Sequence, residues 1–170
     1  MSHDPASGKI LQAAYKVDWP GYSMPPSEQW YRSDDVPEAF RILVAASNQK
    51  EGRDAYNRML FAIGNNHAGC LYPAAVPAVP LLIRVVRELR GWPRWSALEI
   101  LIECLTFGVD REEFIDPSGS TIRTKDAIVA AVRSAREDIQ RLARDQVVAP
   151  TSTSAQDLLE QLDDEPLASE

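Results

Sequence analysis

Hydrophobic residues recur along much of this chain at spacings of three and four, the period of an amphipathic helix. In one such segment Phe40, Leu43 and Val44 share a face, and Asp34 and Asp35 precede it in the position of a helix N-cap. Segments of this kind predict helices over residues 36–48, 53–63, 73–89, 94–107 and 125–145. The pattern therefore predicts an all-α fold.

The first four predicted helices form two pairs, because short turns rich in Gly, Asn and Pro join the members of each pair. The pairs begin at residues 36 and 73, which is roughly the spacing of two-helix repeats. Neither pair can bury its apolar face alone. We therefore expect the helical hairpins to stack, with the segment 125–145 as a C-terminal capping helix.

Three parts follow from this pattern. Residues 1–33 mix turn formers with the aromatics Trp19, Tyr22, Trp30 and Tyr31, which predicts an N-terminal aromatic arm packed on the body, with a short helix over 10–17. Residues 34–148 form the helical domain. Residues 149–170 are rich in Ser and Thr and then acidic, and we expect a disordered acidic tail, with a helix over 155–162 as the alternative.

The formal charge of −7 lies mostly in that tail. Residues 151–170 hold six acids and no base, so residues 1–150 hold 19 acids and 18 bases. A nearly neutral body argues against a nucleic-acid partner, which requires a basic surface. Without an apolar run of bilayer length or a secretory leader pattern, we expect no membrane contact and a cytoplasmic location, and the two cysteines indicate reduced thiols.

The segment His67-Ala68-Gly69-Cys70-Leu71-Tyr72, followed by an Ala- and Pro-rich helix to Leu82, carries a family resemblance. It resembles small bacterial HEAT-repeat-like proteins over about residues 57–107. The resemblance implies an α-solenoid scaffold without shared chemistry. Some of these proteins look like immunity proteins that block a bacterial toxin, so a cognate toxin is one implied partner.

Acidic residues provide the first candidate binding site. Glu99 and Glu103 lie one turn apart on the same face of their helix and predict a solvent-facing stripe. Such a stripe could bind a basic partner. The other interpretation, a pair of carboxylates for acid/base catalysis, is less favoured. Asp110, Glu112 and Glu113 follow in a charged loop. Trp92 lies in the turn between two helices and is a candidate interface anchor.

The loop around His67 is the second candidate site. His67 and Tyr72, with Glu103, would favour a small-molecule enzyme or ligand carrier if they lined one deep pocket. His67 with Cys70 lacks the further ligands of a metal site, so we expect no metal and no cofactor. A cluster of arginines, Arg84, Arg87 and Arg90, could bind phosphate. The favoured interpretation is that these cations complement the negative end of their own helix and pair with Glu88.

The pattern as a whole predicts a protein–protein interaction module and no catalytic residues. The expected partner is another protein, and neutralising a toxin by covering its active site is the specific form that the resemblance suggests. The alternative is the small-molecule enzyme or carrier that uses the His67 loop.

Overall fold

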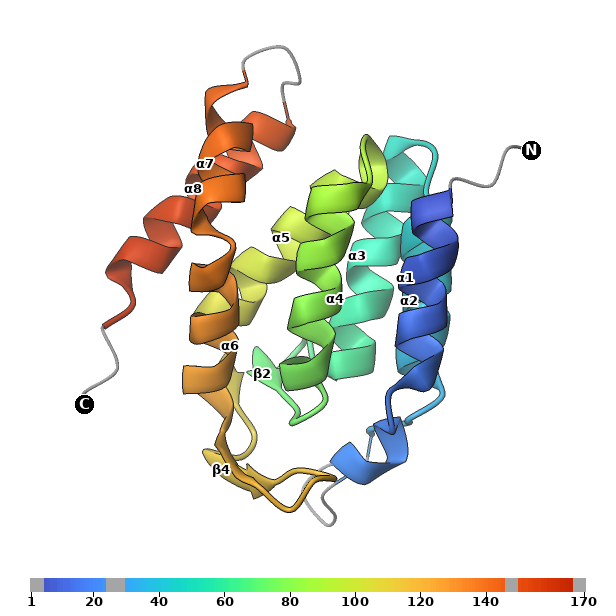
Figure 1. Cartoon of the computed structure of the whole chain (residues 1–170), viewed down its shortest axis with the longest axis vertical. Coiled ribbons are helices and arrows are strands. Elements are labelled where there is room, and N and C mark those ends of the chain that lie inside the picture. The colour runs from blue at the N-terminus through green and yellow to red at the C-terminus, as the bar shows by residue number, and fades with distance from the viewer. Residues whose placement is uncertain (1–4, 24–29, 146–149, 167–170) are drawn as a thin grey trace.

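A computed structural model describes residues 5–23, 30–145 and 150–166 and confirms the all-α class (Figure 1). The helices are α1 Pro5–Lys16, α2 Asp35–Ala45, α3 Gln49–Ile63, α4 Ala75–Glu88, α5 Trp92–Thr106, α6 Thr124–Ser134, α7 Arg136–Arg144 and α8 Thr151–Asp164, with a 3-10 turn, η1, at Trp19–Tyr22. Short strands join them: β1 Gly64–Asn65, β2 Cys70–Leu71, β3 Gly108–Val109, β4 Glu113–Ile115 and β5 Thr121–Arg123. Within the described ranges, no helix is both long and apolar enough to cross a bilayer.

Helix α5 lies at the centre and packs against α2, α3, α4, α6 and α8. Its buried side chains point in several directions, as the consecutive pairs Leu98 with Ala97 and Leu101 with Ile100 show. A helix that is apolar on most sides must be covered on most sides. The chain meets this requirement by wrapping other helices around α5.

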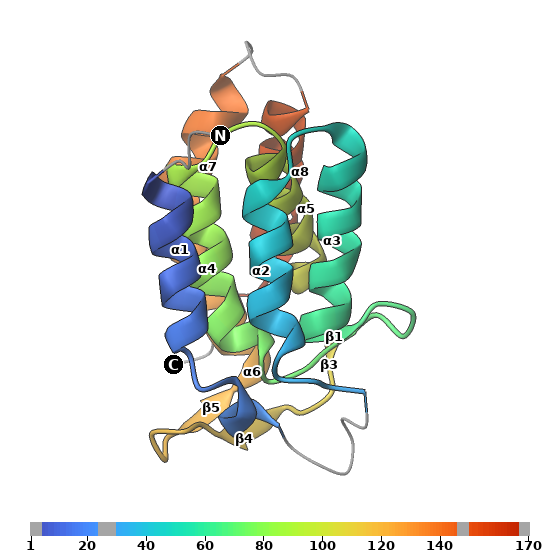
Figure 2. The ribbon, with the colours of Figure 1, turned by 90° about the vertical axis from the view of Figure 1, so that its right-hand side faces the viewer.

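The two predicted hairpins, α2 with α3 and α4 with α5, are present, and α3 packs on α5 (Figure 2). Helix α1 packs on both α2 and α4, and α8 returns to α5 from the far end of the chain. The neighbours of α5 therefore do not follow chain order, as a simple stack of hairpins would require.

The close approach of α3 to α5 depends on Gly52. A Cβ at this position would stand 3.1 Å from Ser96 Oγ and 3.3 Å from a ring carbon of Trp92. The Ser96 hydroxyl is fully buried and lies 2.8 Å from the carbonyl oxygen of Gly52 and 2.9 Å from that of Trp92. A glycine on one helix thus lets a small polar side chain bridge the two backbones.

The N-terminal segment packs on the body through Trp19 and Tyr31, whereas Trp30, also expected to pack, is 69% exposed. Trp19 is 3% exposed, and its indole N–H donates to the carbonyl oxygen of Ala14 at 2.8 Å. The Tyr31 hydroxyl in turn donates to the carbonyl oxygen of Trp19 at 2.9 Å. These bonds satisfy the polar groups of the buried aromatics, and they hold the end of α1 against the residues that precede α2.

The single helix predicted over 125–145 is wrong, because the chain forms two helices that meet at Ala135. The backbone of Ala135 has φ −97° and ψ 4°, outside helical values, and its side chain is buried. The break turns α7 toward α8, against which it packs. Hydrophobic spacing alone does not reveal such a break, since the apolar residues continue at helical spacing through it.

The acidic tail is also corrected, since residues 151–164 form helix α8. Ala155, Leu158 and Leu162 are buried, and α8 packs on α5 and α7. The Arg133 guanidinium donates to the carbonyl oxygen of Glu165 at 2.7 Å, just beyond the helix. The acids lie on the opposite face, so the segment is an amphipathic helix although its composition is typical of disorder. Residues 149 and 167–170 of the predicted tail lie outside the described ranges.

Candidate protein-binding surface

The charged loop predicted after α5 contains a β-hairpin. Strands β4 and β5 are antiparallel, and they pair Glu113 with Arg123 and Ile115 with Thr121. The hairpin lies at the lower end of the molecule in Figure 1, beyond the ends of α4 and α6. It therefore projects from the helical body and is accessible to a partner.

Asp116 organises the turn of this hairpin. Its Oδ1 accepts hydrogen bonds from the Ser118 hydroxyl at 2.6 Å and from the backbone N–H groups of Ser118 and Ser120 at 2.9 Å each. These bonds, that of the Ser118 hydroxyl first, lower the pKa of Asp116. Gly119 takes the left-handed backbone conformation, φ +86°, that the turn needs. The carboxylate thus serves the turn itself.

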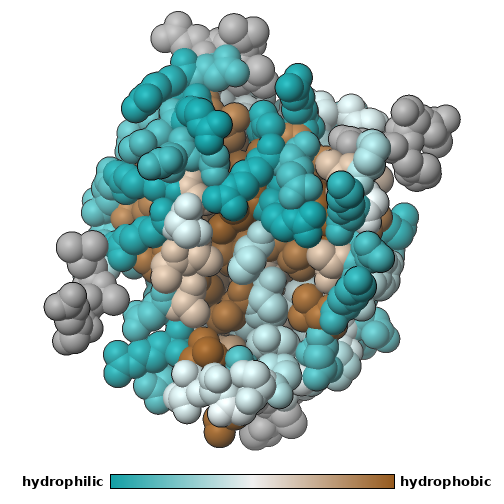
Figure 3. Space-filling model, viewed as in Figure 1, coloured by the Kyte–Doolittle hydropathy of each residue, from teal (hydrophilic) through white to brown (hydrophobic). Residues whose placement is uncertain are grey.

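Alternation along β4 divides its side chains between the body and the solvent. Phe114 is 5% exposed and packs edge-to-face on Tyr22 of η1, with ring centroids 5.9 Å apart. Ile115, the next residue, is 62% exposed. The buried phenylalanine therefore fixes the hairpin while the isoleucine is held out in solvent. Brown apolar atoms protrude at this lower edge of the space-filling view (Figure 3).

Two acidic residues, Glu112 and Glu113, come shortly before Ile115 in the chain, and Glu113 lies on the same strand as Ile115. Glu112 and Glu113 are exposed, and Glu113 accepts from Arg123 Nε at 3.1 Å. An Nη atom of Arg123 lies 3.8 Å from Asp126. With Lys125 these residues line a cavity of about 360 Å³. Such exposed ion pairs contribute little to stability. A basic side chain of a partner can therefore replace Arg123 as the counter-ion of these acids with little loss of free energy.

Lys125 does not neutralise this surface, because its ammonium group points at the end of α5. Its Nζ donates to the carbonyl oxygens of Leu105 and, at 3.1 Å, Phe107, and it lies 3.7 Å from Glu165. A cation at these carbonyls complements the negative end of the helix dipole. The lysine therefore fixes the base of the hairpin to α5.

The predicted solvent stripe of Glu99 and Glu103 is wrong, because other helices cover it. Glu99 accepts a hydrogen bond from the Ser154 hydroxyl of α8. Glu103 accepts from the Tyr56 hydroxyl of α3 at 2.7 Å. Burial, followed by the bond to Glu103, raises the pKa of Tyr56, so the phenol stays protonated and remains a donor.

Asp110 is half-buried at the end of β3, apart from the exposed hairpin. Its backbone N–H donates to the Leu71 carbonyl at 2.8 Å. One carboxylate oxygen is buried without a hydrogen-bond partner among the described residues. The pKa of the neighbouring Cys70 thiol is raised, first by burial and then by the charge of Asp110. Asp110 thus does not share the exposed acidic surface.

Trp92 lies at the end of the molecule away from the hairpin, at the start of α5 (Figure 1). Its ring packs edge-to-face on Trp95, with centroids 5.5 Å apart. It is half-buried and lies against Gly52 of α3. Trp92 therefore stabilises the packing of α3 on α5.

The residues of the alternative small-molecule site have separate neighbours. His67 is exposed and packs edge-to-face on Phe61, with centroids 5.0 Å apart. Tyr72 is 4% exposed and packs on Tyr31 in the core. Since Glu103 is bonded to Tyr56, the structure does not bring the three proposed pocket residues together.

The sequence analysis did not single out Ile115, an exposed apolar residue of the candidate surface. The available signal was a pair of short segments with high β propensity, Phe114-Ile115 and Thr121-Ile122, on either side of an Asp-Pro-Ser-Gly turn. Two such runs around a turn are typical of a hairpin. The charge of the segment obscured this pattern.

No family model, curated protein or solved structure matches this chain. The resemblance to HEAT-repeat-like proteins therefore stays a prediction.

Proposed function

We propose that this chain is a protein-binding domain that contacts a basic partner protein through the β4–β5 hairpin. The observation that carries the proposal is the exposure of Ile115 next to Glu112 and Glu113, on a hairpin fixed by buried Phe114. An apolar anchor flanked by polar and charged residues is a common arrangement in protein–protein interfaces.

The charge of the hairpin region specifies the kind of partner. Residues 112–126 contain four acids and two bases, and the ammonium group of one of those bases, Lys125, points at the end of α5. An acidic surface attracts a basic protein and accelerates its association. Salt screens this attraction, so the association rate falls as the ionic strength rises. The body of the domain would then cover the part of the partner next to the hairpin, inhibiting it by occlusion.

A bacterial toxin neutralised in the cytoplasm is the specific partner that we propose on the basis of the resemblance. In that case the acids of the hairpin would pair with basic residues near the active site of the toxin. This identification rests on the proposed binding mode and is tested separately, by asking whether the captured protein is toxic when produced without this chain.

The binding mode is tested by capturing partners from the source cell with the tagged chain and measuring affinity for the captured protein. Ile115→Asp and Glu112→Lys each alter the surface without touching Phe114. Asp157→Lys, an exposed charge reversal on α8, is the matched control. We expect both hairpin variants to weaken binding by about tenfold or more, and the control to have little effect. Unchanged affinity of both hairpin variants would remove the hairpin from the interface.

A further inference from the structure

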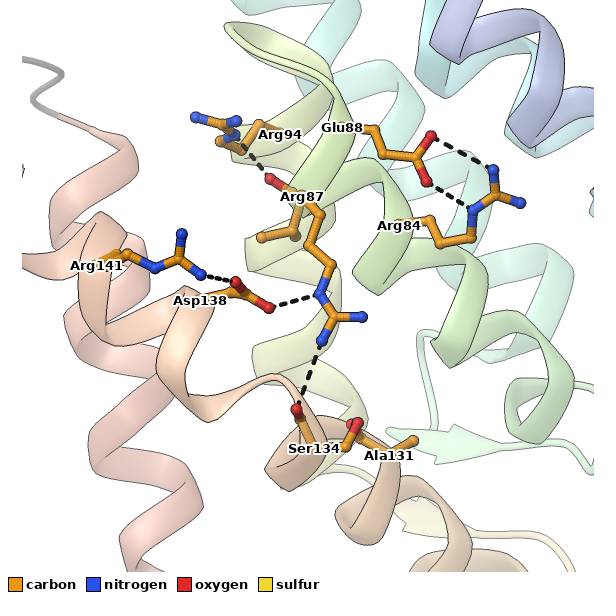
Figure 4. A network of polar contacts seen from close by, with 9 residues as sticks. Arg84, Arg87, Glu88, Arg94, Ala131, Ser134, Asp138 and Arg141 are labelled. Carbon is orange, nitrogen blue, oxygen red and sulfur yellow. Dashed lines mark hydrogen bonds and ion pairs between the residues drawn. The ribbon is translucent and has the colours of Figure 1, made fainter.

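Three arginines converge on a small pocket at the end of the molecule opposite the hairpin. The pocket lies between the end of α4, the start of α5 and α7, has a volume of about 140 Å³, and is lined by Val86, Arg87, Arg94, Asp138, Arg141 and Leu142. Figure 4 shows the guanidinium groups of Arg87 and Arg141 on either side of Asp138, with Arg94 on the neighbouring helix. Hydrophilic atoms dominate the upper part of the space-filling view, where these elements lie (Figure 3).

A single carboxylate serves two of these arginines. Asp138 Oδ2 accepts from Arg87 Nε at 2.6 Å, and Asp138 Oδ1 accepts from Arg141. Arg84 and Glu88 form a separate pair on α4, with Nε 2.8 Å from Oε1, which confirms the pairing expected for that part of the cluster. The ion pairs therefore account for Arg84 and leave Arg87 and Arg141 sharing one negative charge.

Arg94 brings a third positive charge to the pocket. Its Nε donates to the carbonyl oxygen of Val86 at 2.9 Å, which orients the guanidinium group. Burial, followed by the charge of Arg90, lowers the pKa of Arg94, while Asp145 opposes this effect. Over residues 5–23, 30–145 and 150–166, no carboxylate is hydrogen-bonded to Arg94. A partly desolvated cation of this kind is stabilised by an anion.

The lining residues carry three positive charges and one negative charge, a net charge of +2. We propose that this pocket binds a phosphate group, held between the guanidinium groups of Arg94 and Arg141. The net charge matches a phosphate dianion, and planar guanidinium groups donate paired hydrogen bonds to its oxygens. The volume accommodates one tetrahedral oxyanion with a few waters. Asp138 does not block it, because both of its oxygens are already bonded to arginine.

The phosphate can be a free ion or a monoester on a larger molecule, and the probes distinguish the two. Inorganic phosphate and O-phosphoserine are titrated into the full chain at constant low ionic strength, with binding followed by the amide and guanidinium NMR signals. Tighter binding of inorganic phosphate indicates the free ion, and equal or tighter binding of O-phosphoserine indicates a monoester. Both outcomes support a phosphate site.

Arg141→Gln tests the position of the site, because this side chain is 74% exposed and its loss does not empty the core. Arg84→Gln is the matched control, since Arg84 lies on α4 outside the pocket lining. We expect Arg141→Gln to weaken phosphate binding by about tenfold and Arg84→Gln to leave it nearly unchanged. Non-saturable shifts with both probes, or equal effects of the two substitutions, would overturn the proposal.

Discussion

Ser154 on α8 donates a hydrogen bond to the carboxylate of Glu99 on α5, across 55 positions of sequence. The serine hydroxyl is nearly buried, and the same oxygen lies 3.0 Å from the carbonyl oxygen of Pro150 at the start of α8. One small side chain thus links the first turn of the last helix to the central helix. This contact also keeps Glu99 from serving as a partner-binding acid.

Ser154→Ala is expected to lower the free energy of unfolding by about 1–2 kcal/mol, because it removes a donor from a partly buried carboxylate. Urea unfolding measures the loss. Thr153→Ala is the control, since Thr153 is exposed on the same helix. Equal small losses in the two variants would show that the Ser154 bond adds nothing to stability.

Leu158→Ala is expected to lower the free energy of unfolding by about 2–4 kcal/mol, because it removes a fully buried side chain between helices. Leu159→Ala, at the half-buried neighbouring position, should cost clearly less. Both values come from chemical denaturation. If neither substitution changed stability, α8 would not be packed on α5, and a disordered tail would describe this segment better.

Gly64→Ala is expected to destabilise the fold by about 1–3 kcal/mol. A Cβ at this position would stand 2.5 Å from the carbonyl oxygen of Cys70, a backbone atom that cannot rotate away. Gly8→Ala is the matched control, because a Cβ there meets nothing within 4 Å and α1 gains a better helix former. Thermal unfolding should place the midpoints of the two variants on opposite sides of that of the parent chain. A Gly64→Ala midpoint at or above the parent value would contradict the close approach of β1 to β2.

Cys104 is expected to make the free energy of unfolding fall as pH rises through the alkaline range. Burial raises the pKa of its thiol from 9.0 to about 12, with Lys125 opposing the shift and Glu103 adding to it. The folded state therefore favours the protonated thiol more than the unfolded state does. Its contribution is complete below pH 9, the thiol pKa of the unfolded chain, and is lost as pH rises toward about 12.

Comparison with Cys104→Val isolates this contribution from other groups that titrate above pH 9. The free energy of unfolding of the parent chain should fall more steeply with pH than that of the variant, by up to about 1.4 kcal/mol per pH unit. Urea titrations at a series of alkaline pH values provide the two slopes. Parallel slopes would show that Cys104 is not buried as a thiol.

Helical spacing predicted the existence of α2 to α5 well, because each of these helices has apolar residues that recur at three and four. The same spacing misjudged α6 and α7, since Val132 and Ile139 continue the period across the break at Ala135. It also left α8 as an alternative only. The apolar face of Leu158 and Leu162 is narrow and lies among acids. The acidic composition therefore favoured a disordered segment over the helix that the leucine spacing indicates.

The proposed binding surface was predictable in part. Glu112 and Glu113 are exposed as expected, because they follow a helix end and begin a projecting hairpin. Glu99 and Glu103 are not, because the helices that cover them are distant in sequence, and the spacing within one helix cannot show which of its polar residues have internal partners. Only tertiary contacts with Ser154 and Tyr56 decide that question.

The central position of α5 has a thermodynamic consequence. Helices from the first and the second half of the chain both pack against it, through α2 and α3 on one part and α6 and α8 on the other. Neither half can melt without uncovering a helix that the other half also requires. Spectroscopic probes placed near Trp19 and near Leu158 should therefore report one cooperative transition with a common midpoint.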